Sequence, residues 1–167
     1  MTEESDDTEA RLARLEKDMV RVHACFEKAR KWLEMDAEVS LGQARKAAEA
    51  ICKQIYVHEG CEKGSKPADK MMLNDLIGRL ARDKLIPQRI GVALGTIQAF
   101  GNLGVHDQGE ESDHITADTA TPCLNALSTV VTWYTTEYHK HDFSAKLQEK
   151  EEPETKPTKK NFIKCCL

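Results

Sequence analysis

Polar side chains that could do chemistry gather in one short stretch, Phe100-Gly101-Asn102-Leu103-Gly104-Val105-His106-Asp107. Asn102 and His106 are four residues apart, so on a helix they share one face. A histidine can take up or release a proton near neutral pH, and an asparagine can both donate and accept hydrogen bonds. The two glycines, three residues apart, predict a close approach of two backbones or a break in a helix.

The Asn102–His106 pair has more than one interpretation. In the first, both side chains belong to a buried polar network, in which Asn102 satisfies backbone groups near Gly101 and His106 bonds a helix end or Asp107. In the second, the same residues bind a ligand or a nucleotide. In the third, His106 is a catalytic acid or base.

The composition favours one α-helical domain with tails. The chain has 167 residues, of which 40% are hydrophobic and only 5% aromatic, as is typical of a helical bundle packed with Leu, Ile, Ala and Val. The net charge of −4 gives no overall basic field, so nucleic-acid binding would need a local patch. No apolar run approaches the roughly 18 residues that span a bilayer, and the acidic N-terminus is unlike a secretory signal. We therefore expect a cytoplasmic protein.

The cysteines and histidines do not predict a metal site or a cofactor. The six cysteines lack a Cys-x-x-Cys motif and paired zinc spacing. Those at positions 25, 52 and 123 fall in helical patterns, where a free cysteine behaves as a small hydrophobe. His114, His139 and His141 could join Cys123 on a metal ion, but His-x-His at a helix end more often faces the helix dipole.

The first predicted helix is the longest, and runs from about Thr8 to Leu33. Its apolar residues step alternately by three and four, which is the a/d pattern of a narrow helical seam: Leu12, Leu15, Met19, Val22, Phe26, Ala29 and Leu33. One interpretation is a bundle helix that packs on its neighbours. The other is that its N-terminal half projects and pairs with a second copy, which predicts a homodimer.

Four further helices follow from capping residues and apolar periodicity. Ser40 and Gln43 predict a capping box for the second helix, in which Arg45 and Glu49 could pair, and Gly60 is its expected stop. The remaining starts are Pro67 for the third helix, Pro87 for the fourth, and Thr121-Pro122 for the fifth, which ends near residues 139–141. Basic residues between positions 63 and 89 are interpreted as a solvated face, because no aromatic residues interleave them.

The predicted organisation is a disordered N-terminus over residues 1–7, a helical domain over 8–141, and a disordered charged tail over 142–167. The tail ends Lys164-Cys165-Cys166-Leu167 and lacks the cysteine that a standard prenylation box requires at position 164. Its x-C-C-x ending resembles the tails of Rab-type GTPases. Lipidation of Cys165 and Cys166 beside four lysines would tether the chain to membranes in a eukaryotic cell. The alternative is a pair of free thiols.

The order and spacing of several segments resemble the domain-of-unknown-function 4145 family over about residues 25–140. The segments are Asp36 to Tyr56, with Arg45-Lys46 and Glu49; Leu73-Asn74-Asp75-Leu76-Ile77; Ile97 to Asp107; and Pro122 to Tyr134. That family looks like part of the HEPN group of helical domains, which includes metal-independent ribonucleases and inert scaffolds. The resemblance implies an all-α, HEPN-like bundle of about five helices, of a kind often found beside defence or signalling modules.

HEPN ribonucleases use an arginine and a histidine, often with an asparagine after the arginine. Asn102 and His106 match the asparagine and the histidine, but the arginine positions hold Ala99, Phe100 or Gly101. Relatives often have arginine where Gln98 stands, and glutamine carries no charge. The expected binding residues are therefore Gln98, Asn102, His106 and Asp107, without a predicted enzyme activity.

We expect a non-catalytic, self-associating interaction module of a defence or signalling system, with an unidentified protein partner. An RNA-cleaving or nucleotide-binding domain that uses Asn102 and His106 is the alternative, and a lipid-anchored adaptor is a further one. Nucleic-acid binding is only weakly supported by this sequence.

Overall fold

The computed structural model describes residues 3–106 and 115–139, with the side chains of residues 13, 16–103 and 115–139. All the regular structure in these residues is helical, which confirms the all-α prediction of about five helices. The helices are α1 (Glu3–Trp32), α2 (Ala37–His58), α3 (Leu73–Arg82), α4 (Gln88–His106) and α5 (Ala117–Trp133), with a 3₁₀ turn η1 (Ala68–Lys70) and a π turn η2 (Tyr134–Tyr138).

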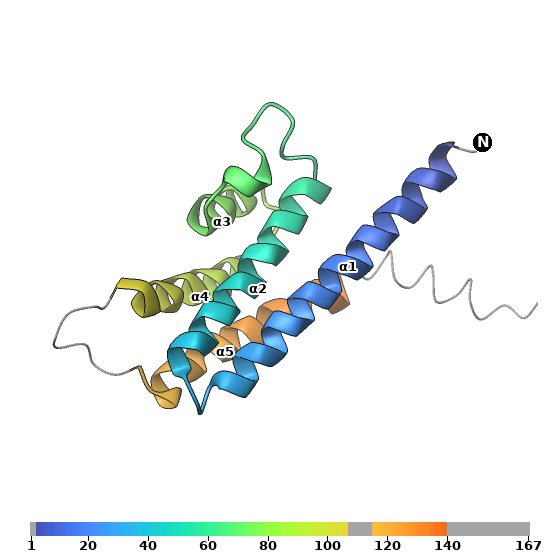
Figure 1. The fold of residues 1–167 in the computed structure, drawn as a ribbon. Coiled ribbons are helices and arrows are strands. Elements are labelled where there is room, and N and C mark those ends of the chain that lie inside the picture. The colour runs from blue at the N-terminus through green and yellow to red at the C-terminus, as the bar shows by residue number, and fades with distance from the viewer. Residues whose placement is uncertain (1–2, 107–114, 140–167) are drawn as a thin grey trace, which may run out of the picture.

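Helix α2 is the centre of the bundle, because it contacts each of the other four α-helices. Figure 1 shows α1 folding back along α2, α4 and α5 lying across them, and α3 near the C-terminal end of α2. Eleven of the 22 residues of α2 are buried, and five of these are alanines. Small side chains let neighbouring helices approach closely, so the alanine-rich sequence of α2 suits its central position.

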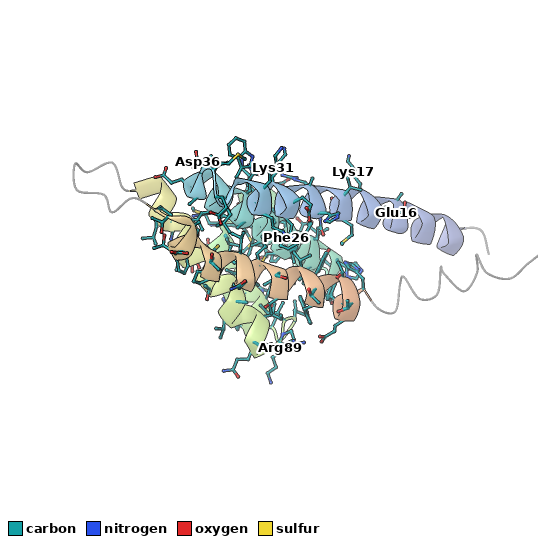
Figure 2. All side chains as sticks on the ribbon, turned by 90° about the horizontal axis from the view of Figure 1, so that it is seen from below. Glu16, Lys17, Phe26, Lys31, Asp36 and Arg89 are labelled. Carbon is teal, nitrogen blue, oxygen red and sulfur yellow. The ribbon has the colours of Figure 1, made fainter. Side chains whose placement is uncertain are left out.

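Helix α1 both packs on the bundle and extends beyond it. Val22 and Ala29 are fully buried, and Met19 and Phe26 pack against the core. Phe26 lies on the side of α1 that faces the bundle, whereas Glu16 and Lys17 lie near the point where α1 leaves it (Figure 2). The helix continues to Glu3, five residues further than the predicted start at Thr8. Residues 3–7 are thus helical, although we predicted disorder, and their acidic side chains favour a helix N-terminus.

Helix α2 begins at Ala37, three residues before the predicted capping residue Ser40. Asp36 is the N-cap, and its carboxylate accepts a hydrogen bond from the Val39 amide at 3.0 Å. Ser40 is fully buried, and its hydroxyl donates to the Ala29 carbonyl at 2.7 Å. Ala29 lies in the last turn of α1, where carbonyls lose their helical partners. Ser40 therefore joins α1 to α2 instead of capping α2.

The starts of α3 and α5 also differ from the predicted ones. Pro67 precedes the short η1 turn, and α3 itself begins at Leu73. Helix α5 begins at Ala117, after a capping box in which Thr116 and Thr119 bond each other's backbone amides. Pro122 therefore lies inside α5. Its exposed position lets the helix accommodate a residue that has no amide hydrogen to donate.

Helices α2 and α3 end in the same way, with the chain in a left-handed conformation. The predicted stop at Gly60 is confirmed: its φ is 69°, and the Cys61 amide bonds the Tyr56 carbonyl at 3.0 Å. After α3 the equivalent residue is Lys84, with a φ of 56°, and the Leu85 amide bonds the Leu80 carbonyl at 2.9 Å. Both endings have the hydrogen bonds of the Schellman motif. A lysine is an unfavourable residue for this conformation.

We expect Lys84→Gly to stabilise the protein by about 1 kcal/mol, because glycine adopts a positive φ without a steric penalty. Ala81→Gly is the matched control, since it places glycine at an exposed, right-handed position of α3 and should cost about 1 kcal/mol. Urea denaturation followed by circular dichroism measures both changes. Equal effects of the two glycines would contradict the role given to Lys84.

Candidate functional site

The glycine-containing stretch is a continuous part of α4, which ends at His106. The predicted helix break at Gly101 is therefore absent. Where the alternative predicted a second backbone, the three atoms nearest to the Cβ position of Gly101 belong to the side chain of Arg45. Asn102 is half-buried in this stretch, and its Oδ1 accepts a short hydrogen bond from Nη1 of Arg45. Arg45 lies on α2, 57 residues away in the chain. The Arg45–Asn102 hydrogen bond thus connects α2 to the glycine-containing stretch of α4.

Gly101 is required for this arrangement because the stem of Arg45 crosses α4 directly over it. A Cβ atom built on Gly101 would lie 3.0 Å from Cδ, 3.2 Å from Cβ and 3.4 Å from Cγ of Arg45. Few real Cβ atoms have neighbours this close. Gly95, one and a half turns earlier in α4, has open space at the same position. The two glycines therefore differ sharply in what a side chain would meet.

The structure replaces the predicted pairing of Arg45 with Glu49. Glu49 instead bonds Lys53, four residues on, with Oε1 and Nζ 2.7 Å apart. Glu49 is four residues from Arg45 and four residues from Lys53, so helical spacing alone does not decide which of the two it pairs with. Arg45 points across to α4 because Gly101 leaves room for its stem.

The remaining predicted binding residues are only partly placed. Gln98 is half-buried on α4, one turn before Asn102. His106 is the last residue of α4, and its side chain is outside the described part of the structure. Asp107 also lies outside the described residues. The structure therefore brings Arg45 to Asn102, and leaves the grouping of these two with His106 and Asp107 as a prediction from helical spacing.

Arg45 is the residue of this site that the sequence did not reveal. The clue was its place between Ala44 and Ala48, both fully buried, on a helix rich in small side chains. A long charged side chain at the border of such a face must cross a neighbouring helix or turn to solvent. The glycine that allows the crossing is on a different helix, so no local pattern connects the two residues.

A second polar cluster joins the C-terminal ends of α2 and α5. The Tyr138 hydroxyl donates to Oε1 of Glu59 at 2.7 Å, and it lies 2.8 Å from Nδ1 of His58. His139 is buried, with its ring 4.4 Å from that of Tyr134 at a steep angle. The π turn η2 adds one residue to this helical turn, which places Tyr134 and Tyr138 in a stacked arrangement. His139 thus packs among aromatic rings at the end of the chain's last described helix.

The sequence leaves metal binding by His114, His139, His141 and Cys123 as an alternative without predicting it. In the described part of the chain, no three His, Cys, Asp or Glu side chains come close enough to hold a metal ion. His114 and His141 lie outside the described residues. Cys123 is fully buried, and burial raises the pKa of its thiol to about 11.

Carboxylates on neighbouring turns or helices pair with two of the basic residues in the middle of the chain. Arg79 bonds Asp83 at 2.5 Å, and Arg89 of α4 bonds Glu137 of η2 at 2.5 Å. Figure 2 shows Arg89 pointing away from the bundle. These exposed pairs agree with the interpretation of a solvated face and do not form a continuous basic track.

Comparison with known proteins decides the family. The model of the family described as "Domain of unknown function (DUF4145)" matches residues 27–156. The chain belongs to the DUF4145 family. The DUF4145 match begins near the end of α1 and includes α2 to α5, so it contains both Arg45 and Asn102. No curated protein and no solved structure matches the chain significantly.

The DUF4145 match leaves most of α1 outside the family domain. Residues 3–26 precede the matched region and include the part of α1 that extends beyond the bundle (Figure 1). No helix in the described residues has the length and apolar character needed to cross a membrane.

Proposed function

We propose that this protein is a non-catalytic helical interaction module that associates with a second copy of itself through the projecting part of α1. The observation that carries the proposal is the length of α1. With 30 residues it is longer than α2, its main partner, which has 22. Its N-terminal part extends beyond the other helices (Figure 1).

The sequence supports a partner for this projecting part. The seam that buries Val22 and Ala29 inside the bundle continues along the chain with Leu12 and Leu15 at the same heptad positions. Two leucines on an isolated helix would stay in water unless another helix covers them. A second copy of α1 presents the same seam, and a two-fold pair is the commonest form of self-association.

A non-catalytic role agrees with the composition of α4. The positions where a HEPN-type ribonuclease would have its arginine hold Ala99, Phe100 and Gly101, and a Cβ atom at Gly101 would already lie 3.0 Å from Cδ of Arg45. The placement in a defence or signalling system rests on the family resemblance. RNA cleavage that disappears in His106→Ala, with folding intact, would favour the ribonuclease alternative instead.

The proposal predicts that Leu12→Glu with Leu15→Glu abolishes self-association, because two charges would enter the apolar seam. The matched control is Ala10→Glu with Ala13→Glu, which adds the same charges at heptad positions away from the seam and should leave association intact. Sedimentation velocity of the two double variants measures the difference. Equal association of both variants, or a loss in both, would contradict an interface along this seam.

The C-terminal cysteines carry a separate prediction for a eukaryotic host. Cys165 and Cys166 lie outside the described residues, and the proposed lipid anchor rests on the sequence alone. A fusion that carries residues 142–167 should partition to membranes, and Cys165→Ser with Cys166→Ser should release it, because two chains or one chain with lysines give stable anchoring. Mass spectrometry of the intact protein decides the point. An unmodified terminus with two free thiols would contradict the proposed lipid anchor.

A further inference from the structure

Arg45 has an unusual environment for a half-buried guanidinium. Among the described side chains, those of residues 13, 16–103 and 115–139, its one polar partner is the neutral amide oxygen of Asn102, and no carboxylate lies within 4.0 Å. Glu49, one turn along α2, is bonded to Lys53. A guanidinium stays charged at all ordinary pH values, and removing it from water without an anionic partner is unfavourable.

Arg45 and Asn102 together offer more hydrogen-bond donors than acceptors. The guanidinium has five N–H groups, of which the bond to Asn102 uses one. Because Oδ1 of Asn102 accepts that bond, the amide nitrogen of Asn102 is left as a donor. The two side chains therefore present N–H groups from two helices at one place.

The stem of Arg45 is held in position, so its donors are preorganised. Its Cβ, Cγ and Cδ atoms lie against the backbone of α4 at Gly101, and Nη1 is fixed by Asn102. A planar guanidinium held in this way can make two parallel hydrogen bonds to the oxygens of a phosphate or carboxylate group. A fixed fork loses less conformational entropy on binding than a free arginine does.

We propose that Arg45 and Asn102 form a binding site for an oxyanion group, with phosphate as the preferred occupant. Arg45 supplies the positive charge and a bidentate fork, and Asn102 both orients the fork and donates through its amide. Gly101 admits the arginine stem. The site does not depend on self-association through α1, and it requires no catalytic step.

Thermal unfolding of the full chain in inorganic phosphate tests the site directly. Sodium chloride and sodium acetate at the same pH and ionic strength are the reference solutions. A ligand that binds only the folded state raises Tm with the logarithm of its concentration. We expect phosphate to raise Tm above the value in chloride. A similar rise in acetate would mean that the site accepts carboxylates as the same class of oxyanion.

Three variants locate the effect. Arg45→Gln should weaken phosphate binding by about tenfold or more, because a charge-assisted pair of hydrogen bonds is lost. Lys46→Gln removes the same charge from the next, exposed residue of α2 and should bind phosphate as the wild type does. Asn102→Asp supplies Arg45 with an internal carboxylate, so this variant should fold normally and lose the phosphate effect.

Three results would overturn the proposal. The first is a phosphate effect no larger than that of chloride in the wild type, which would leave Arg45 as a structural tie between α2 and α4. The second is an undiminished effect in Arg45→Gln. The third is full phosphate binding by a correctly folded Asn102→Asp variant. This variant tests the proposal even if Arg45→Gln does not fold.

Discussion

The protein should lose stability steeply as the pH rises from 9 to 12, because two buried thiols keep their protons to a higher pH in the folded protein than in the unfolded chain. Cys52 and Cys123 are both fully excluded from solvent. Burial raises the pKa of Cys52 from 9.0 to about 12, with a smaller contribution from Glu49, and burial alone raises that of Cys123 to about 11.

The sign of the change in stability follows from the number of protons that the folded and unfolded states bind. Between pH 9 and these raised pKa values, both thiols keep their protons in the folded protein and lose them in the unfolded chain. The unfolded state then binds fewer protons, so the free energy of unfolding falls as the pH rises. The loss is about 4 kcal/mol for Cys52 and about 3 kcal/mol for Cys123, an appreciable fraction of a typical total. Burial also raises the pKa of Tyr134, which acts in the same direction above pH 10.

Urea denaturation at pH 8, 10 and 11 measures this loss. Cys52→Ala with Cys123→Ala should be less stable than the wild type at pH 8, because each change leaves a small cavity. It should nevertheless lose less stability between pH 8 and 11. Cys25→Ala leaves both buried thiols in place and serves as the control. If all three proteins lose the same free energy over this range, the buried thiols do not control alkaline unfolding.

Alanine should have opposite effects at Gly95 and Gly101, two of the glycines of α4. Gly95→Ala should stabilise the protein by about 1 kcal/mol, because alanine is the better helix former and meets nothing within 4 Å. Gly101→Ala should destabilise it by about 1 kcal/mol, since the new methyl group would lie 3.0 Å from Cδ and 3.2 Å from Cβ of Arg45, and these atoms must shift to admit it. Overpacking typically costs about 1–3 kcal/mol, which exceeds the gain in helix propensity.

A double-mutant cycle separates the contact from the helix propensity. Arg45→Ala removes Cγ and Cδ of residue 45, the second of which is the nearest atom to the Gly101 methyl, and leaves Cβ at 3.2 Å. Gly101→Ala should therefore cost less in that background than in the wild type. The coupling free energy should be about 1 kcal/mol, measured by urea denaturation. Additive effects of Arg45→Ala and Gly101→Ala would show that the two side chains do not compete for the same space.

The helices were predictable because their signals are local. Apolar residues at spacings of three and four marked the buried faces of α1 and α2, and Gly60 marked the end of α2. Lys84 ends α3 in the same left-handed conformation, but a lysine gives no sign of it. The reason is tertiary: Leu85 and Ile86 pack against the core and impose the turn on whatever residue precedes them.

The contact that defines the candidate site could not be predicted. Arg45 and Asn102 are 57 residues apart, and their meeting depends on the angle at which α2 crosses α4. Neither helix encodes that angle locally, because small side chains on α2 fit several crossing angles. The two glycines in a helical pattern predicted either a close approach of two backbones or a helix break, and so marked Gly101 as a special position without deciding its role. The sequence could not tell which residue would approach.

Self-association through α1 is the central claim, and the mass of the wild-type protein in solution tests it most directly. Sedimentation equilibrium of the full chain should give a weight-average mass that rises toward twice the monomer mass at tens of micromolar, roughly the range of weak dimers. Removal of residues 1–15 should return the protein to the monomer mass with its helical content otherwise unchanged. A full-length protein that remains a monomer throughout this range would contradict the account.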